Sequence, residues 1–186
     1  PSISSDGKVL YFASDRPGGK GKQDIWMSEI NEQGNFSIPK NLGDSINTKQ
    51  NEMSPFIHAD NSTLYFASDG HLGMGSVDLF FARKKPDSSW STPENMGYPI
   101  NTSDDELSLV VNSSGKKAYF SSDREGGFGS KDIYVFDLYE GARPNQTTYF
   151  KGIIVDSETS LPLDADFELI DIETGNLIMN SKSSAK

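Results

Sequence analysis

One stretch of the sequence recurs three times at a fixed interval of 54 residues, and this repetition constrains the fold more than any other feature. The copies are "SDRPGGKGKQDIW" from Ser14, "SDGHLGMGSVDLF" from Ser68 and "SDREGGFGSKDIY" from Ser122, and they align without gaps. Sequence periods of this order are typical of repeat architectures, in which each unit buries its apolar face against the next. Because a single pocket needs only one copy of its motif, the repetition predicts architecture rather than an active site.

Short apolar segments surround each glycine loop. "VLYFAS", "TLYFAS" and "KAYFSS" precede the three loops, and "DIWMSEI", "DLFFARK" and "DIYVFDL" follow them. Each unit opens with a short run ("SIS", "PFIH" or "LVVN"), and two units add a fourth segment, "FSIPKNLGDSINT" and "WSTPENMGYPINT". Aromatic and β-branched runs bounded by Gly, Asn, Asp and Pro predict strands, and no helical period is sustained. The predicted fold class is all-β: three antiparallel β-propeller blades of an incomplete propeller, plus part of a β-sandwich.

The first glycine loop superficially resembles a phosphate-binding loop, but the match fails. Gly21-Lys22 is followed by Gln23, where such a loop needs Ser or Thr. Lys20 and Lys22 are also replaced by uncharged residues in the other two copies. A phosphate site would retain its charges, so we predict no bound cofactor.

The aspartates of the loops have two interpretations. In the structural one, the aspartate that begins the strand after each loop (Asp24, Asp78, Asp132) accepts backbone N–H bonds from that loop. Glycines in the loop then permit the positive φ of a tight connection. The alternative is calcium held between pairs of aspartates, although calcium requires six or more oxygen ligands. The structural motif includes Gly19, Gly73 and Gly127, and the calcium candidates are Asp15, Asp24, Asp69, Asp78, Asp123 and Asp132.

Other polar residues give no catalytic pattern. Glu52 and Glu106 occupy equivalent positions before the next blade, which favours inter-blade hydrogen bonding over a ligand role. His58 and His71 belong to no zinc motif; we predict a solvated side chain for His71 and a surface or hydrogen-bonded one for His58. A nucleophile elbow of the G-x-S-x-G type does not occur. We therefore predict no catalytic residues and a protein that is not an enzyme.

Composition excludes several classes of partner. The formal net charge of −10 disfavours nucleic acid and anionic membrane surfaces. No apolar run is long enough for a transmembrane helix, so we predict no membrane insertion by this segment. The chain has no cysteine and therefore no disulfide.

The repeat resembles that of a known family of β-propellers. "YFASDRPGGKGKQDIW", "INTKQNEMSPFI" and "YFSSDREGGFGSKDIYVFDL" resemble the WD-like repeat of TolB-type β-propellers, in the glycine-rich version of OmpA-family envelope proteins from Bacteroidetes-type bacteria. The later sequence resembles the opening of a carboxypeptidase-regulatory-like β-sandwich. The predicted domains are residues 1–146, the three blades, and 147–186, the start of the sandwich. The residues that fit the sandwich pattern, with a one-residue shift, are Gly152, Val155, Asp156, Thr159, Pro162 and Leu163.

The resemblance implies a function and a location. Relatives of this kind are periplasmic, outer-membrane-associated scaffolds, and one belongs to the type IX secretion apparatus. Their partners are other envelope proteins, and they bind peptidoglycan through a domain outside this chain. The alternative is the propeller domain of a hydrolase or of a glycan-binding protein.

The repeat is expected to be incomplete. Three blades fall short of the four to eight that usually close a propeller, and the third copy of the fourth segment is absent, so the repeat ends near Leu138. Apolar blade flanks left uncovered predict self-association of the isolated chain. Beyond them, "TYFKGIIVD" and "DFELIDIE" predict strands separate from the propeller, with a tight turn at "ETGN".

Overall fold

The computed structural model describes residues 1–147 and 152–183. The chain divides into two compact units, 1–147 and 148–186, so the division lies one residue beyond the boundary expected from the sequence. Each unit is described separately below. No helix in the described part of the chain has the length and apolar character needed to cross a membrane.

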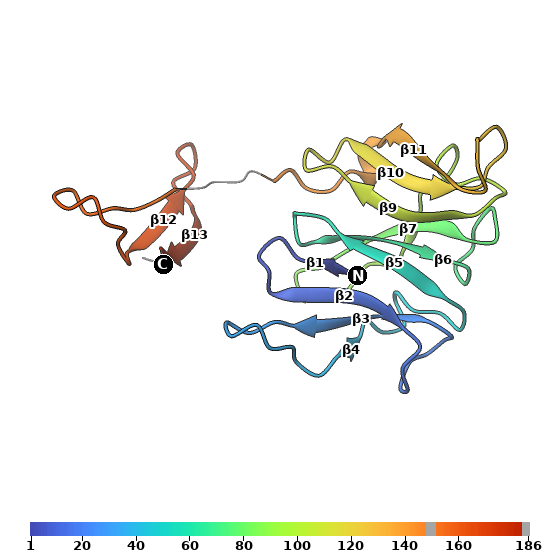
Figure 1. Cartoon of the computed structure of the whole chain (residues 1–186), viewed down its shortest axis with the longest axis horizontal. Coiled ribbons are helices and arrows are strands. Elements are labelled where there is room, and N and C mark those ends of the chain that lie inside the picture. The colour runs from blue at the N-terminus through green and yellow to red at the C-terminus, as the bar shows by residue number, and fades with distance from the viewer. Residues whose placement is uncertain (148–151, 184–186) are drawn as a thin grey trace. The chain divides into compact units, whose positions relative to one another are not determined.

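The first unit consists of three antiparallel sheets that lie side by side in chain order (Figure 1). Each sheet corresponds to one copy of the repeat and is called the first, second or third blade. The first and second blades have four strands each, and the third has three. The strands are β1 (Ser2–Ile3), β2 (Val9–Ser14), β3 (Asp24–Glu29) and β4 (Lys40–Asn41); β5 (Glu52–Ile57), β6 (Thr63–Ser68), β7 (Asp78–Arg83) and β8 (Glu94–Asn95); and β9 (Glu106–Val111), β10 (Lys117–Ser122) and β11 (Asp132–Asp137).

The register of the strands repeats from blade to blade. Ser14 pairs with Asp24 across the first glycine loop, and Ser68 pairs with Asp78 across the second. The fourth strand is only two residues long in both complete blades. Most of the predicted fourth segment is therefore irregular, and its contacts are described with the site.

Two apolar cores lie between successive blades. The first joins Tyr11 and Ile25 of the first blade to Leu64, Phe66 and Phe80 of the second. The second joins the opposite face of the second blade to the third, and it includes Tyr65, Leu79, Phe81, Leu109 and Phe120. Because side chains alternate between the faces of a strand, neighbouring residues of the second blade belong to different cores. This blade is consequently buried on both faces.

After β11 the chain does not turn back along the third blade. A short 3-10 helix, η1 (Glu140–Ala142), carries it to the second blade instead. The Tyr65 hydroxyl donates to the carbonyl of Ala142 at 2.6 Å, and the Arg83 guanidinium donates to the carbonyls of Gly141 and Arg143. The main chain of residues 141–143 is thus bonded to the second blade.

In its described residues, 152–183, the second unit contains one hairpin, β12 (Asp166–Ile170) and β13 (Leu177–Lys182). The predicted strand at "DFELIDIE" and the turn at "ETGN" correspond to this hairpin and its turn. The predicted strand over 148–156 is wrong where it can be compared: Val155 makes only an isolated bridge with Pro162. Its first residues, 148–151, lie outside the described part. Without a paired neighbour, β-propensity alone does not form a strand.

Candidate functional site

Each glycine loop closes on the aspartate that begins the strand after it. The carboxylate accepts hydrogen bonds from the backbone N–H groups four and three residues earlier, as the sequence predicts. The N–O distances are 2.8 to 3.1 Å in the second and third copies. The donors are Lys20 and Gly21 to Asp24, Met74 and Gly75 to Asp78, and Phe128 and Gly129 to Asp132.

The glycine five residues before each aspartate is needed for space. A Cβ atom at Gly19, Gly73 or Gly127 would overlap the Oδ2 atom of the aspartate in its own loop. The positive φ predicted for glycines of this loop is found one residue earlier, at Gly18 and Gly126, each with φ +91°. Gly19, Gly73 and Gly127 do not have positive φ and serve to leave room for the carboxylate.

The other loop aspartates bind the linker that precedes their blade. Asp69 accepts bonds from the backbone and side-chain nitrogens of Asn51, at 2.6 and 2.8 Å. Asp123 accepts the N–H of Asp105, which lowers the pKa of the Asp123 carboxyl. Asp15 is the exposed equivalent in the first loop. Among residues 1–147 and 152–183, no group of three or more His, Asp or Glu side chains is placed to hold a metal ion.

Glu52 and Glu106 are buried at the junctions between blades. Glu52 accepts bonds from the backbone N–H and hydroxyl of Thr48, in the preceding linker, and from the hydroxyl of Ser68 on β6, each at 2.8 Å. Glu106 makes the same three kinds of bond in the third blade and also pairs with Arg124 at 3.1 Å. These carboxylates therefore join each linker to the blade that follows it.

His71 takes the place that Arg124 has one blade later. Arg124 stacks on Phe120 and donates to the carbonyl of Ile100 at 2.6 Å. The ring of His71 packs against Phe66, and its Nε2 bonds the carbonyl of Ile46 at 2.8 Å. The expectation of a solvated His71 is wrong, because the side chain fills the same inter-blade position from one residue further along the loop.

His58 is fully buried between the second and third blades. Of the two environments predicted for it, surface or hydrogen-bonded, the hydrogen-bonded one is confirmed. Its Nε2 bonds the carbonyl of Asn112 in the third blade at 3.1 Å. Burial raises the pKa of the neighbouring Asp60 carboxyl, but the His58 ring 3.7 Å away and bonds from Thr63 and Ser62 outweigh burial and hold that pKa below its usual value.

A second motif, which the sequence analysis did not identify as functional, closes the outer edge of the two complete blades. The side-chain amide of the buried Asn47 brackets Ile25, accepting from its N–H at 2.8 Å and donating to its C=O at 3.0 Å. Asn101 brackets Leu79 in the same way, at 2.8 Å for both bonds. The sequence contains a signal for this motif, since "INT" occurs in the first two copies of the repeat at an interval of 54 residues. In the third copy, Val155 replaces the asparagine.

Within the first unit, the third blade has neither this closing segment nor a further blade on its outward face, and the side chains of that face are exposed. Ile133, the equivalent of Leu79, is 82% exposed, whereas Leu79 is 1% exposed. Tyr119 is 40% exposed, and its equivalent Tyr65 is fully buried. Val135 is 52% exposed and pairs with Tyr119 across β10 and β11. We call Tyr119, Ile133 and Val135 the open flank.

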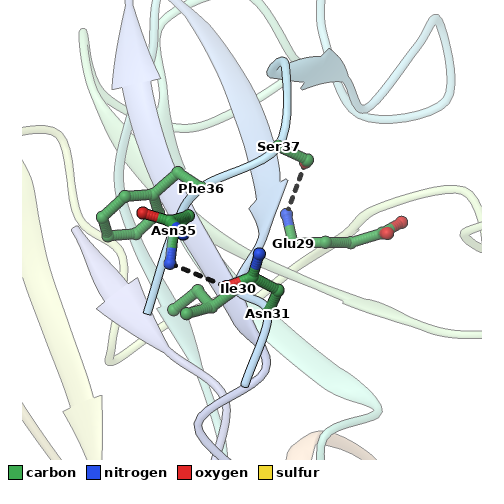
Figure 2. A pocket seen from close by; sticks show the side chains of 6 residues that line it. All are labelled: Glu29, Ile30, Asn31, Asn35, Phe36 and Ser37. Atoms are coloured by element: carbon green, nitrogen blue, oxygen red, sulfur yellow. Dashed lines mark hydrogen bonds between the residues drawn. The ribbon is translucent and has the colours of Figure 1, made fainter. Parts of the chain in front are cut away.

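A shallow hollow of about 230 Å³ lies at the turn between β3 and β4 (Figure 2). Its lining includes Ile30, Asn35 and Phe36. The lining carboxylate, Glu29, pairs with Lys40 at 2.9 Å and points away from the other lining side chains in Figure 2. The Ser37 hydroxyl accepts a hydrogen bond from the backbone N–H of Glu29 and so stabilises the turn. The hollow brings together no acid, base or nucleophile suited to a reaction.

Comparison with known proteins places the fold. No protein-family model matches the chain, and no curated protein matches its sequence. Solved structures that share the fold include two TolB proteins. The putative TolB of Agrobacterium tumefaciens aligns with a TM-score of 0.52 at 18% identity, and TolB of Acinetobacter baumannii with 0.51 at 14%. Both alignments cover 74% of this chain but only 44% and 29% of those proteins. A puromycin hydrolase structure aligns with a TM-score of 0.38, too low to support an argument. The chain therefore has a TolB-like β-propeller fold and spans less than half the length of these proteins.

Proposed function

We propose that this chain is a non-catalytic protein-interaction scaffold from an OmpA-family, peptidoglycan-linked protein of the bacterial envelope. The observation that carries the proposal is the open flank. Tyr119, Ile133 and Val135 present apolar surface on a rigid sheet, at positions that are buried against a neighbour in the second blade. Exposed apolar patches of this kind are typical of association sites.

The proposed location is the periplasm, in association with the outer membrane. Two observations support it: the glycine-rich repeat resembles that of OmpA-family envelope proteins, and the fold is similar to TolB. The partners would be other envelope proteins, including components of a type IX secretion apparatus. Peptidoglycan would be bound through a domain outside this chain. The net charge of −10 argues against nucleic acid as a partner.

The function can be tested on the full-length protein in the bacterium that encodes it. A photo-crosslinking residue at Tyr119 should capture an envelope protein identified by mass spectrometry. The same residue at Ile38, which is exposed on the first blade, is the matched control and should not capture it. The full-length protein should also sediment with isolated peptidoglycan, while the 186-residue chain alone should not.

Two results would contradict the scaffold. One is recovery of the full-length protein in the cytoplasmic fraction. The other is evidence for the alternative function, the propeller of a hydrolase or of a glycan-binding protein. This evidence would be a Ser-Asp-His hydrolase domain in the complete reading frame, or turnover of peptide or glycan substrates by the purified protein.

A further inference from the structure

The glycine loops of the second and third blades carry exposed apolar side chains at their tips. Leu72 is 96% exposed and Met74 is 53% exposed, and Phe128 is fully exposed. The N–H groups of Met74 and Phe128 are bonded to Asp78 and Asp132, so the main chain that carries these side chains is fixed. Apolar side chains that a fixed loop exposes to water are typical contacts for another molecule.

Two positions at this surface form an ion pair in the first blade and are apolar or aromatic in the second. Lys20 of the first glycine loop pairs with Asp44 of the closing segment at 3.1 Å. Their equivalents one blade later are Met74 and Tyr98, and Tyr98 is 78% exposed. The first blade forms the same loop with a lysine at this position, so the fold of the loop does not require an apolar residue there. The exchange therefore indicates a contact outside the chain.

The three glycine loops lie at the same ends of their sheets, on the right-hand side of Figure 1. The linkers between blades lie beside them: the N–H of Lys22 donates to the carbonyl of Gln50 at 2.8 Å, and a Cβ atom at Gly70 would overlap the same linker. The next linker is bonded to the third loop, because the N–H of Asp105 donates to Asp123 at 2.9 Å. We call this surface the loop strip, which comprises residues 15–24, 44–51, 69–78, 98–105 and 123–132.

The two ends of the loop strip carry opposite charge. Among its side chains that are not buried, the end at the first blade has mostly basic residues and the end at the third blade mostly acidic ones. The first set is Arg16, Lys20, Lys22 and Lys49 with Asp15 and Asp44, and the second is Asp104, Asp105, Asp123 and Glu125 with Arg124 and Lys131. In the part of the chain that the structure describes, Lys22 and Lys49 make no ion pair. Among the same residues, Asp104 and Glu125 make none at the other end.

We infer that two copies of this chain associate through the loop strip, around a two-fold axis that crosses the strip at the second loop. Such an axis places the first loop of each copy on the third loop of the other, because the three loops follow one another across adjacent sheets. Met74 then meets its counterpart at the axis, and Phe128 of each copy meets Lys20 of the other. The inference goes beyond the scaffold function proposed above, since it concerns a surface distinct from the open flank.

The charges of the loop strip favour a second copy as its occupant. With the axis at the second loop, Lys22 and Lys49 of each copy face the acidic end of the other. A partner of one charge, such as a nucleic acid or an anionic membrane, would be repelled by one end of the strip. The dimer also places apolar side chains at its centre and charged ones at its rim, which is the usual distribution in protein interfaces.

The test measures the mass of the whole 186-residue chain by light scattering and sedimentation, from about 5 to 500 μM. The wild-type chain should dimerise in this range. Lys22→Glu combined with Lys49→Glu should weaken dimerisation at least about tenfold, because two acidic ends then face each other. Asp104→Lys combined with Glu125→Lys should weaken it equally. An equimolar mixture of the two double variants should dimerise again, since each basic end then meets an acidic one.

Single substitutions and a control locate the contact. Met74→Asp should weaken dimerisation at least about tenfold without changing the melting temperature, because it places two carboxylates at the axis and its side chain is exposed in the free chain. Lys85→Glu combined with Lys116→Glu, at the opposite ends of the strands, is the matched control and should leave dimerisation unchanged. Ile133→Lys, on the open flank, should also leave it unchanged.

Several outcomes would overturn the inference: a chain that stays monomeric up to about 500 μM, a mixture of the two double variants that does not dimerise, or a dimer that is lost with Ile133→Lys and kept with Met74→Asp. Sedimentation of a monomeric chain with phosphatidylcholine vesicles, abolished by Met74→Asp, would assign the loop strip to a lipid surface and would also overturn it. If the dimer fails while crosslinking at Tyr119 still captures an envelope protein, this inference falls and the scaffold function stands.

Discussion

The second and third blades are built from the same repeat, yet only the second is closed. Its β6 and β7 are buried along almost their whole length, between the first and third blades. In the third blade, β11 alternates between half-buried and exposed residues, because within the first unit one face and one edge have no neighbour. The glycine loop and its aspartate are formed in both.

This difference shows that the local structure of a blade and the burial of its side chains have separate causes. The local motif determines the turn and the strand pairing, since Asp132 caps its loop without a closing segment. Burial is determined by the neighbouring blades, since Leu79 is 1% exposed and its equivalent Ile133 is 82% exposed. Most of the stability of a blade should therefore come from what packs on it, and three pairs of equivalent positions in the second and third blades test this.

The largest difference is expected for the equivalent tyrosines. Tyr65→Ala should destabilise the chain by about 3–5 kcal/mol, because it removes a fully buried ring and leaves the carbonyl of Ala142 without its donor. Tyr119→Ala, at a half-exposed ring, should cost less than about 1 kcal/mol. Urea unfolding measures both, and equal losses would mean that the third blade is as well packed as the second.

A smaller difference is expected for the loop aspartates. Asp78→Ala should cost about 1–3 kcal/mol, since the N–H groups of Met74 and Gly75 lose their acceptor at a buried site. Asp132→Ala should cost less, because water reaches the third loop. Calcium should leave the melting temperature unchanged. A calcium-dependent rise that Asp78→Ala abolishes would favour the calcium interpretation instead.

The glycines that face the linker give the next pair. Gly75→Ala should destabilise the chain by about 1–2 kcal/mol, because the new methyl group meets the carbonyl of Asp104. Gly129→Ala should be neutral within about 0.5 kcal/mol, since the same space is open. Thermal unfolding of the two variants measures this difference in stability. A destabilisation by Gly129→Ala comparable to that by Gly75→Ala would show that another segment already covers the third loop.

The smallest effect is expected in the stability of the chain at acidic pH, through Asp60. The folded-state pKa of Asp60 lies below its ordinary value of 3.8, so its contribution to stability is complete above that pH and is lost as the pH falls through the folded-state pKa. Wild type should therefore exceed Asp60→Asn in unfolding free energy by a constant amount above about pH 5, and by less below about pH 4. A difference that persists unchanged to about pH 3 would assign the stabilisation to packing around His58 instead of to the charge.

Much of the blade architecture could be predicted because the repeat encodes it locally. Three copies in register predicted the strands, the loop hydrogen bonds of Asp24 and its equivalents, and the missing fourth segment after Leu138. The position of His71 was not predictable from register alone, since a one-residue shift places an imidazole where Arg124 has a guanidinium. The role of Asn47 depends on a contact with Ile25, 22 residues earlier, which only the folded blade brings together.

The second unit was predicted less well for a physical reason. Its hairpin follows from the alternating residues around the tight turn that ends at Gly175. The segment near Val155 has the composition of a strand but forms a single bridge. Its apolar residues, such as Ile153 and Ile172, are largely exposed, so little packing fixes their conformation.

Within the first unit, the third blade is open at its outer edge, whereas the first and second blades are closed. Amide hydrogen exchange at Ile25, Leu79 and Ile133 tests it directly, because these three N–H groups occupy the same position in the repeat. The N–H groups of Ile25 and Leu79 are bonded to Asn47 and Asn101, and should exchange slowly. In the monomeric chain, Ile133 should exchange about 100-fold faster, as expected for an unprotected edge. Equal protection of all three amides would contradict the account.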